Sequence, residues 1–127
     1  LERMDHFLAA KAALAARYRQ ALEGLPLQFQ GERAGTQHSH WLVSFVCDSP
    51  AHRDPLRAHL ASRGIETRPL FHPVHTMPMY ARHFRRHPVA EDLAWRGINL
   101  PSWPGLSDQE ADVVCAAVHE FFDKHAA

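Results

Sequence analysis

The amino-acid sequence predicts a small α/β domain of the two-layer α+β type, in which a three-stranded sheet is packed by helices on one face. Apolar residues recur at helical spacing near both ends of the chain, and short runs rich in β-branched and aromatic residues lie between them. Glycine or proline separates most of these segments. A length of 127 residues suits one domain with a buried core.

The first 24 residues predict a long helix, because leucine and aromatic residues recur at helical spacing until Gly24 and Pro26 end the pattern. We interpret residues 1–25 as a linker helix that leads into a domain spanning residues 26–127. A long helix packed within the domain is the alternative. The chain begins at Leu1, inside the helical pattern, which we interpret as a truncated N-terminus.

Three short apolar segments predict strands, with helices in the intervals between them. The predicted strands are residues 39–47, 65–70 and 98–100. Asp54 and Pro55 have the pattern of the N-cap and first position of a helix, which Gly64 ends in left-handed geometry. Residues 71–78 predict a loop that is too rich in proline for a helix.

Two more helices are predicted in the second half of the chain. Pro88 begins a short helix that Gly97 ends. Ser107 and Glu110 have the pattern of a capping box, in which each side chain bonds the backbone amide of the other residue. The last helix carries an apolar stripe formed by Val114, Val118, Phe121 and Phe122.

Composition argues against several classes of partner. The 14 basic and 14 acidic residues cancel, which argues against general binding to nucleic acid or to a membrane surface. The sequence has neither the pattern of a signal peptide nor an apolar run long enough to span a bilayer. Cys47 and Cys115 lie in separate apolar runs, which favours buried free thiols over a disulfide and fits a cytoplasmic protein.

The proline-rich loop carries candidate ligand-binding side chains. His72 and His75 lie three residues apart between Pro69 and Pro78, and the prolines restrict the backbone, which lowers the entropy cost of binding. Arg68 is available for an anionic group. Solvent-exposed loop histidines without a ligand are the alternative.

Histidine pairs also raise the question of a metal site. His38 and His40 are two residues apart, and His83 and His87 are four apart. No zinc-ligand pattern such as CxxC or HExxH accompanies them, and such pairs arise by chance in a chain with 11 histidines. We therefore expect no metal site. We also assign no catalytic residue, because the sequence has no GxSxG motif and no thiol beside a histidine.

Two long motifs carry a family resemblance. The first is RGIETRPLFHPVHTMPMY at residues 63–80, and the second is HPVAEDLAWRGINLPSWPGL at residues 87–106, before the capped last helix. In this order they resemble the C-terminal small domain of the DegT/DnrJ/EryC1/StrS family, which are pyridoxal phosphate-dependent sugar aminotransferases of fold type I. The resemblance covers essentially the whole chain. Residues 41–46 and 68–71 are most similar to the perosamine synthase branch.

The resemblance implies amino transfer from glutamate to a 4-keto-6-deoxy sugar linked to a nucleoside diphosphate, with pyridoxal phosphate (PLP) supplying the electronic chemistry. It also implies a cytoplasmic homodimer that serves polysaccharide or antibiotic-sugar synthesis. The family's Schiff-base lysine and other cofactor-binding residues belong to a large N-terminal domain, and Lys11 and Lys124 do not match that lysine motif. We therefore expect this chain alone to bind no PLP and to be inactive, with the large domain and the nucleotide sugar as its partners.

The resemblance also gives roles to the loop. Phe71 stands where the family often has tyrosine, and His75 matches a recurrent histidine, so both would face the sugar or the edge of the cofactor. His72 occupies a variable position, and Arg68 would meet a pyrophosphate or a carboxylate. We predict these four as substrate-binding residues. The alternative function is a stand-alone interaction module derived from the same fold, whose exposed apolar face serves a partner.

Overall fold

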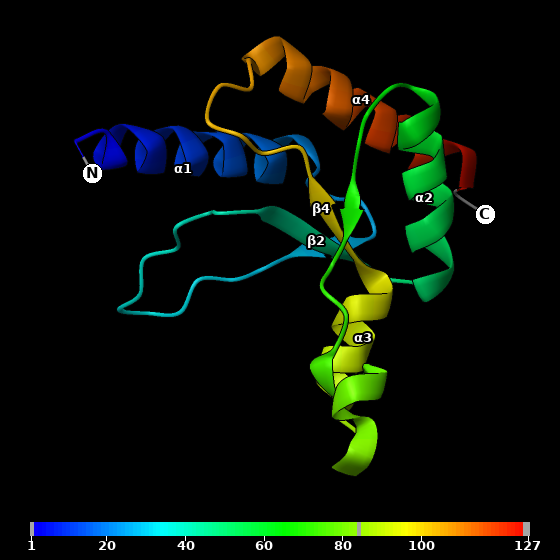
Figure 1. Ribbon diagram of the computed structural model, residues 1–127. Coiled ribbons are helices and arrows are strands. Elements are labelled where there is room, and N and C mark those ends of the chain that lie inside the picture. The colour runs from blue at the N-terminus through cyan, green and yellow to red at the C-terminus, as the bar shows by residue number, and fades with distance from the viewer. Residues whose placement is uncertain (1, 84, 126–127) are drawn as a thin grey trace.

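The computed structural model describes residues 2–83 and 85–125, without the side chains of residues 82 and 83. Figure 1 shows how the elements are arranged. In chain order they are α1 (Met4–Ala21), β1 (Leu27–Phe29), β2 (Val43–Cys47), α2 (Pro50–Ser62), β3 (Arg68–Pro69), the 3-10 helices η1 (Val74–Thr76) and η2 (Pro78–His83), α3 (Pro88–Arg96), β4 (Gly97–Leu100) and α4 (Asp108–His125).

The sheet has four antiparallel strands in the order β1-β2-β4-β3. The prediction of three strands was therefore wrong by one. The additional strand is β1, which pairs Leu27 with Cys47 and Phe29 with Phe45. Three residues are too few to show an alternating pattern, and this segment becomes a strand by pairing with β2. The predicted strand at residues 65–70 is reduced to the two residues of β3.

The core lies on one face of the sheet, which confirms the predicted two-layer architecture. Val43, Phe45 and Cys47 alternate along β2 toward this face, where α1, α2 and α4 contribute buried apolar side chains. The buried residues of these helices include Leu14, Tyr18, Leu56, Leu60, Val114, Val118, Phe121 and Phe122. Cys47 and Cys115 are buried free thiols, as predicted, and burial raises the pKa of each to about 11.

Helix α2 begins earlier than predicted. Its N-cap is Ser49, whose side chain accepts a hydrogen bond from the Ala51 amide at 3.2 Å, and Pro50 follows the cap. Pro55 thus lies inside the helix and does not begin it. The predicted end is confirmed, because Gly64 has a φ of +74° and the Ile65 amide donates to the Leu60 carbonyl, as in a Schellman motif.

Helix α1 ends at Ala21, three residues before the predicted stop at Gly24, whereas the boundaries in the second half of the chain agree with the prediction. Helix α3 begins at Pro88, and Gly97 ends it and begins β4. The capping box is formed, since the Ser107 amide donates to Glu110 Oε2 at 2.8 Å and the Glu110 amide donates to Ser107 Oγ at 3.2 Å. Helix α1 packs against α4, and the division of the chain at residue 25 stays a prediction.

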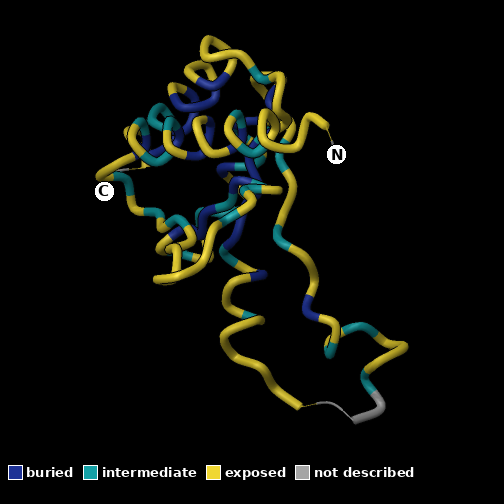
Figure 2. The backbone as a smooth tube through the Cα atoms, turned by 90° about the vertical axis from the view of Figure 1, so that its left-hand side faces the viewer, coloured by how far each residue is buried: buried dark blue, intermediate teal, exposed yellow. Residues whose placement is uncertain are grey.

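An arm projects away from the sheet and its covering helices (Figures 1 and 2). We define it as residues 71–83 and 85–96, which contain η1, η2 and α3. Most of its residues are exposed, as the yellow backbone of Figure 2 shows. The proline-rich loop at residues 71–78 avoids α-helix, as predicted, but it contains the 3-10 helix η1 and leads into η2.

Gly97 provides a test of this packing. A Cβ at position 97 would collide with the Leu70 side chain and lie 2.7 Å from the Leu93 carbonyl oxygen. We expect Gly97→Ala to lower the free energy of unfolding by about 1–3 kcal/mol, measured by urea titration. Gly31→Ala is the control, because a Cβ there meets no atom within 4 Å. Equal stability of the two variants would contradict the close approach at Gly97.

Candidate functional site

A groove of about 820 Å³ is the main candidate site. Its walls come from α1, the segment before β2, the α2–β3 connection, the end of β4 with the loop that follows, and α4. Its lining includes Lys11, Trp41, Arg63, Arg68, Asn99, Ser102, Trp103 and Glu110. The volume lies within the range of small-molecule sites.

Lys11 lines this groove, although nothing in the sequence indicated a role for it there. Its side chain is buried, with 9% of the residue exposed. The ammonium donates to the Trp41 carbonyl at 2.7 Å and to the Ser102 carbonyl. Burial lowers the pKa of Lys11, because the charged form loses its hydration. Seven residues further along α1, the Tyr18 hydroxyl donates to the Pro101 carbonyl at 3.0 Å.

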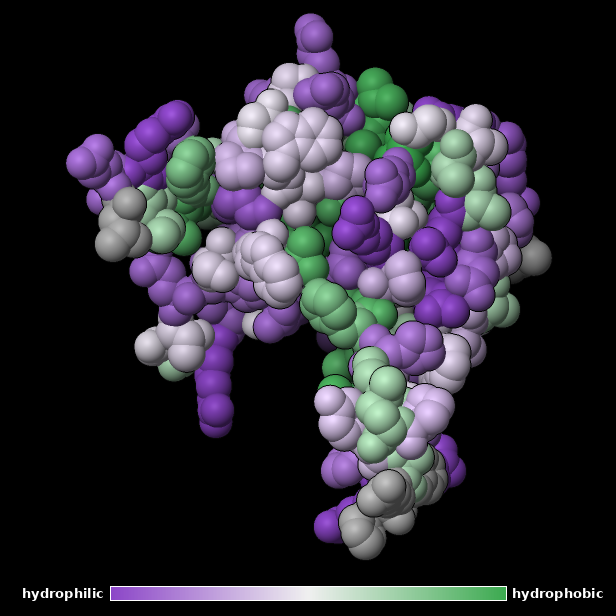
Figure 3. All heavy atoms as spheres, viewed as in Figure 1, coloured by the Kyte–Doolittle hydropathy of each residue, from purple (hydrophilic) through white to green (hydrophobic). Residues whose placement is uncertain are grey.

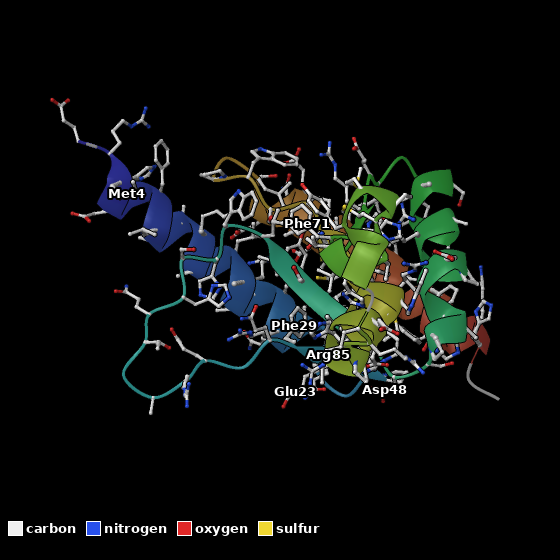
Figure 4. The ribbon with its side chains drawn as sticks, turned by 60° about the horizontal axis from the view of Figure 1, so that its bottom comes forward. Met4, Glu23, Phe29, Asp48, Phe71 and Arg85 are labelled. Carbon is white, nitrogen blue, oxygen red and sulfur yellow. The ribbon has the colours of Figure 1, made fainter. Side chains whose placement is uncertain are left out.

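Exposed aromatic rings lie beside the groove. Trp41 and Phe71 are 69% and 70% exposed, and their rings stack with centroids 6.1 Å apart and an interplanar angle of 18°. Trp103 also lines the groove and is half exposed. Figure 4 shows Phe71 well away from Met4, which lies at the free end of α1. These ring faces offer a flat apolar surface to a ligand or to another protein segment.

Arg68 and Phe71 are thus the two predicted site residues that lie at the groove. Arg68 lines it, is opposite Asn99 in the β3–β4 pairing, and has an exposed guanidinium 3.3 Å from Glu66. Asn99 is buried and fastens β3 to the sheet, because its amide donates to the Pro69 carbonyl at 3.0 Å. Phe71 reaches the groove through its contact with Trp41.

His72 lies at a different place. It lines a smaller hollow of about 130 Å³ together with Arg53, Arg57 and Trp95. Its ring meets the Trp95 ring edge to face, with centroids 6.1 Å apart. The guanidinium of Arg53 already donates to the Ala94 carbonyl and to the Asp54 carboxylate, so much of its bonding capacity is used within the protein.

His75 lies within the arm and is largely buried. Its Nε2 is 3.1 Å from Glu91 Oε1, and both side chains are 16% exposed. Glu91 also accepts from the His87 amide at 3.1 Å and from Arg86 at 3.2 Å. The hydrogen bond with His75 is the main cause that lowers the pKa of Glu91, followed by those from His87 and Arg86. His75 therefore links the loop to α3.

The four predicted site residues accordingly lie at three places, and their role in binding substrate stays a prediction.

The described residues contain no group of three or more potential metal ligands. His38 and His40 instead stack, with ring centroids 4.4 Å apart, and the His40 amide donates to His38 Nδ1 at 2.7 Å. The pair of His83 and His87 involves a side chain outside the described part.

The two lysines have different surroundings, and their expected lack of a role in holding PLP stays a prediction. Lys11 is buried and bonded to two carbonyls, and Lys124 lies at the end of α4, 2.6 Å from Glu120. Among the described residues, no helix is both long and apolar enough to cross a membrane.

Comparison with known proteins identifies the relatives of the chain. The model of the DegT/DnrJ/EryC1/StrS aminotransferase family matches residues 1–119. The GDP-perosamine synthase of Escherichia coli O157:H7 is 44% identical over 122 residues, covering 96% of this chain and 33% of the relative. The GDP-perosamine synthase of Vibrio cholerae is 42% identical, covering 97% and 35%. The chain thus spans about a third of the length of these curated relatives.

Solved structures of aminotransferases share the fold. DesV of S. venezuelae, solved with a ketimine intermediate, is 33% identical and superimposes with a TM-score of 0.88 over 95% of this chain and 33% of its own. The aminotransferase TlmJ of Streptoalloteichus hindustanus is 26% identical, with a TM-score of 0.92 over 99% of this chain and 34% of its own. These matches confirm the predicted fold class.

The Glu91 contacts predict how the protein responds to acid. Because the folded-state pKa of Glu91 is lowered, its contribution to stability is present above the ordinary value of 4.5 and is lost as the pH falls through the folded-state pKa. The melting temperature of Glu91→Gln should therefore lie below that of the wild type at pH 7, and the difference should shrink below about pH 4.5.

Calorimetry between pH 7 and pH 3 measures this difference. Glu66→Gln is the control, because the ion pair of Glu66 with Arg68 is exposed to solvent, and this variant should keep the pH dependence of the wild type. A gap between Glu91→Gln and wild type that stays constant across the range would refute the role given to the His75–Glu91 contact.

Proposed function

Because this chain belongs to the DegT/DnrJ/EryC1/StrS aminotransferase family, we propose that it is the small domain of a PLP-dependent nucleotide-sugar aminotransferase. The reaction is amino transfer from glutamate to a 4-keto-6-deoxy sugar nucleotide. The observation that carries the proposal is the 44% identity to a GDP-perosamine synthase over nearly the whole chain. A Bacillus subtilis relative, 31% identical, is named as a pyridoxal phosphate-dependent aminotransferase, which supports PLP as the cofactor.

In this proposal the chain supplies contacts to the substrate, and PLP is held by residues outside it. Arg68 offers an exposed guanidinium for a phosphate or carboxylate group. Phe71 and Trp41 offer stacked rings for the sugar or the base. The family resemblance places Phe71 where the family often has tyrosine, so a hydrogen bond that such a hydroxyl makes would be missing here. His72 and His75 extend the site along the arm.

The apolar surface supports a further protein contact. Green and pale green side chains run from the body onto the arm in Figure 3. The exposed apolar residues of the arm include Val74, Met79, Tyr80, Val89, Leu93 and Trp95. Such a surface favours contact with another protein segment, which fits the proposed large domain and a cytoplasmic homodimer. The same surface favours the second candidate, an interaction module that has kept the fold without the reaction.

Amination by the complete gene product tests the proposal. Purified protein with PLP and glutamate should convert a GDP-linked 4-keto-6-deoxy sugar to the amino sugar, with 2-oxoglutarate as coproduct, followed by mass spectrometry. Product formation separates the enzyme from the interaction module. Absence of product with this sugar and with its UDP- and dTDP-linked counterparts, from protein that contains PLP, would overturn the proposed function.

His75 is tested in the same assay. The complete gene product carrying His75→Ala should lose at least about tenfold in kcat/KM and keep the visible absorbance of bound PLP, because the contact is to the substrate. His6→Ala is the control, since His6 is exposed on α1, away from the groove and the arm. Turnover of His75→Ala equal to that of His6→Ala would remove His75 from the site.

A further inference from the structure

Lys11 differs from the two arginines of the groove in its partners. Arg63 forms an ion pair with Glu120, and Arg68 forms one with Glu66. Among the described residues, Lys11 has two backbone carbonyls as acceptors and no carboxylate. The positive charge of Lys11 is therefore buried at the groove, and no described carboxylate forms an ion pair with it.

Such an arrangement is costly unless something compensates the charge. Removing an ammonium group from water disfavours its charged form, and burial indeed lowers the pKa of Lys11. An ammonium has three N–H donors, and the carbonyls of Trp41 and Ser102 take two of them. The third N–H and the net charge remain for a group that enters the groove.

We propose that Lys11 binds a diphosphate oxygen of the nucleotide sugar through this third N–H, an inference that rests on the proposed function. An anionic oxygen supplies both the acceptor and the missing counter-charge, and charge-assisted hydrogen bonds of this kind are strong. Lys11 also positions Trp41 and Trp103, which we call the rim of the groove. Its two carbonyl acceptors belong to Trp41 and to Ser102, the residue before Trp103.

The surroundings fit a ligand with one anionic and one planar part. The groove volume of about 820 Å³ accommodates a nucleotide-sized molecule. Arg63 and Arg68 place two further cations on its lining, each of them paired with a glutamate. The exposed rings of Trp41 and Phe71 offer a surface for a planar base. A carboxylate such as that of glutamate shares the chemistry of the anion, so the test must separate the two sources.

The test measures binding to the complete gene product by calorimetry, with GDP, guanosine and L-glutamate as probes. The variant is Lys11→Gln, whose amide has two N–H donors for the carbonyls of Trp41 and Ser102 but no charge. Lys124→Gln is the matched control, because Lys124 pairs with Glu120 on the surface of α4. We expect Lys11→Gln to lower the affinity for GDP about tenfold or more and to leave the affinities for guanosine and glutamate unchanged.

Three results would overturn the inference. The first is an affinity for GDP that Lys11→Gln leaves unchanged. The second is an equal loss of affinity for GDP and guanosine, which indicates a role in shaping the rim alone. The third is a loss of affinity for glutamate instead of GDP. If Lys11→Gln yields no folded protein, Lys11→Arg decides, because it keeps the charge and should keep the preference for GDP over guanosine. Wild type that binds neither GDP nor guanosine would contradict the proposed nucleotide substrate itself.

Discussion

The buried strand β4 is the constraint on which the rest of the molecule depends. It lies between β2 and β3, and all four of its residues are buried. At one end, Gly97 joins it to α3 without an intervening loop, so the strand fixes where the arm leaves the body. At the other end, the chain continues into Pro101 and Ser102, whose carbonyls accept from α1. Strand β4 thus fixes the position of the arm relative to the groove.

Side-chain polar bonds reinforce the two strands beside β4. Asn99 accepts from the Ser44 hydroxyl at 2.6 Å and donates to the Pro69 carbonyl at 3.0 Å, so one amide bridges β2, β4 and β3. Strand β3 is two residues long and includes a proline that has no N–H to donate. The amide of Asn99 therefore supplies part of the bonding that this short strand lacks, and it holds Arg68 at the groove.

Structural features that depend on neighbouring residues could be predicted from the sequence, whereas features that depend on residues far apart in the chain could not. The left-handed Gly64, the capping box of Ser107 and the start of α3 at Pro88 depend on residues within one turn, and all three were predicted. The acceptors of Lys11 are 30 and 91 residues away, so no pattern in α1 reveals its burial. Strand β1 likewise exists through its pairing with β2.

The groove and the arm offer different chemistry to their surroundings. The groove combines a buried cation, a guanidinium and stacked rings, a mixture that suits a small ligand with charged and planar parts. The arm holds its polar groups in internal contacts around Glu91 and leaves valine, methionine and aromatic side chains exposed. The exposed apolar side chains of the arm suit contact with another protein surface. Changes to Lys11 would therefore act on ligand affinity, whereas changes on the exposed apolar side of the arm would act through protein association.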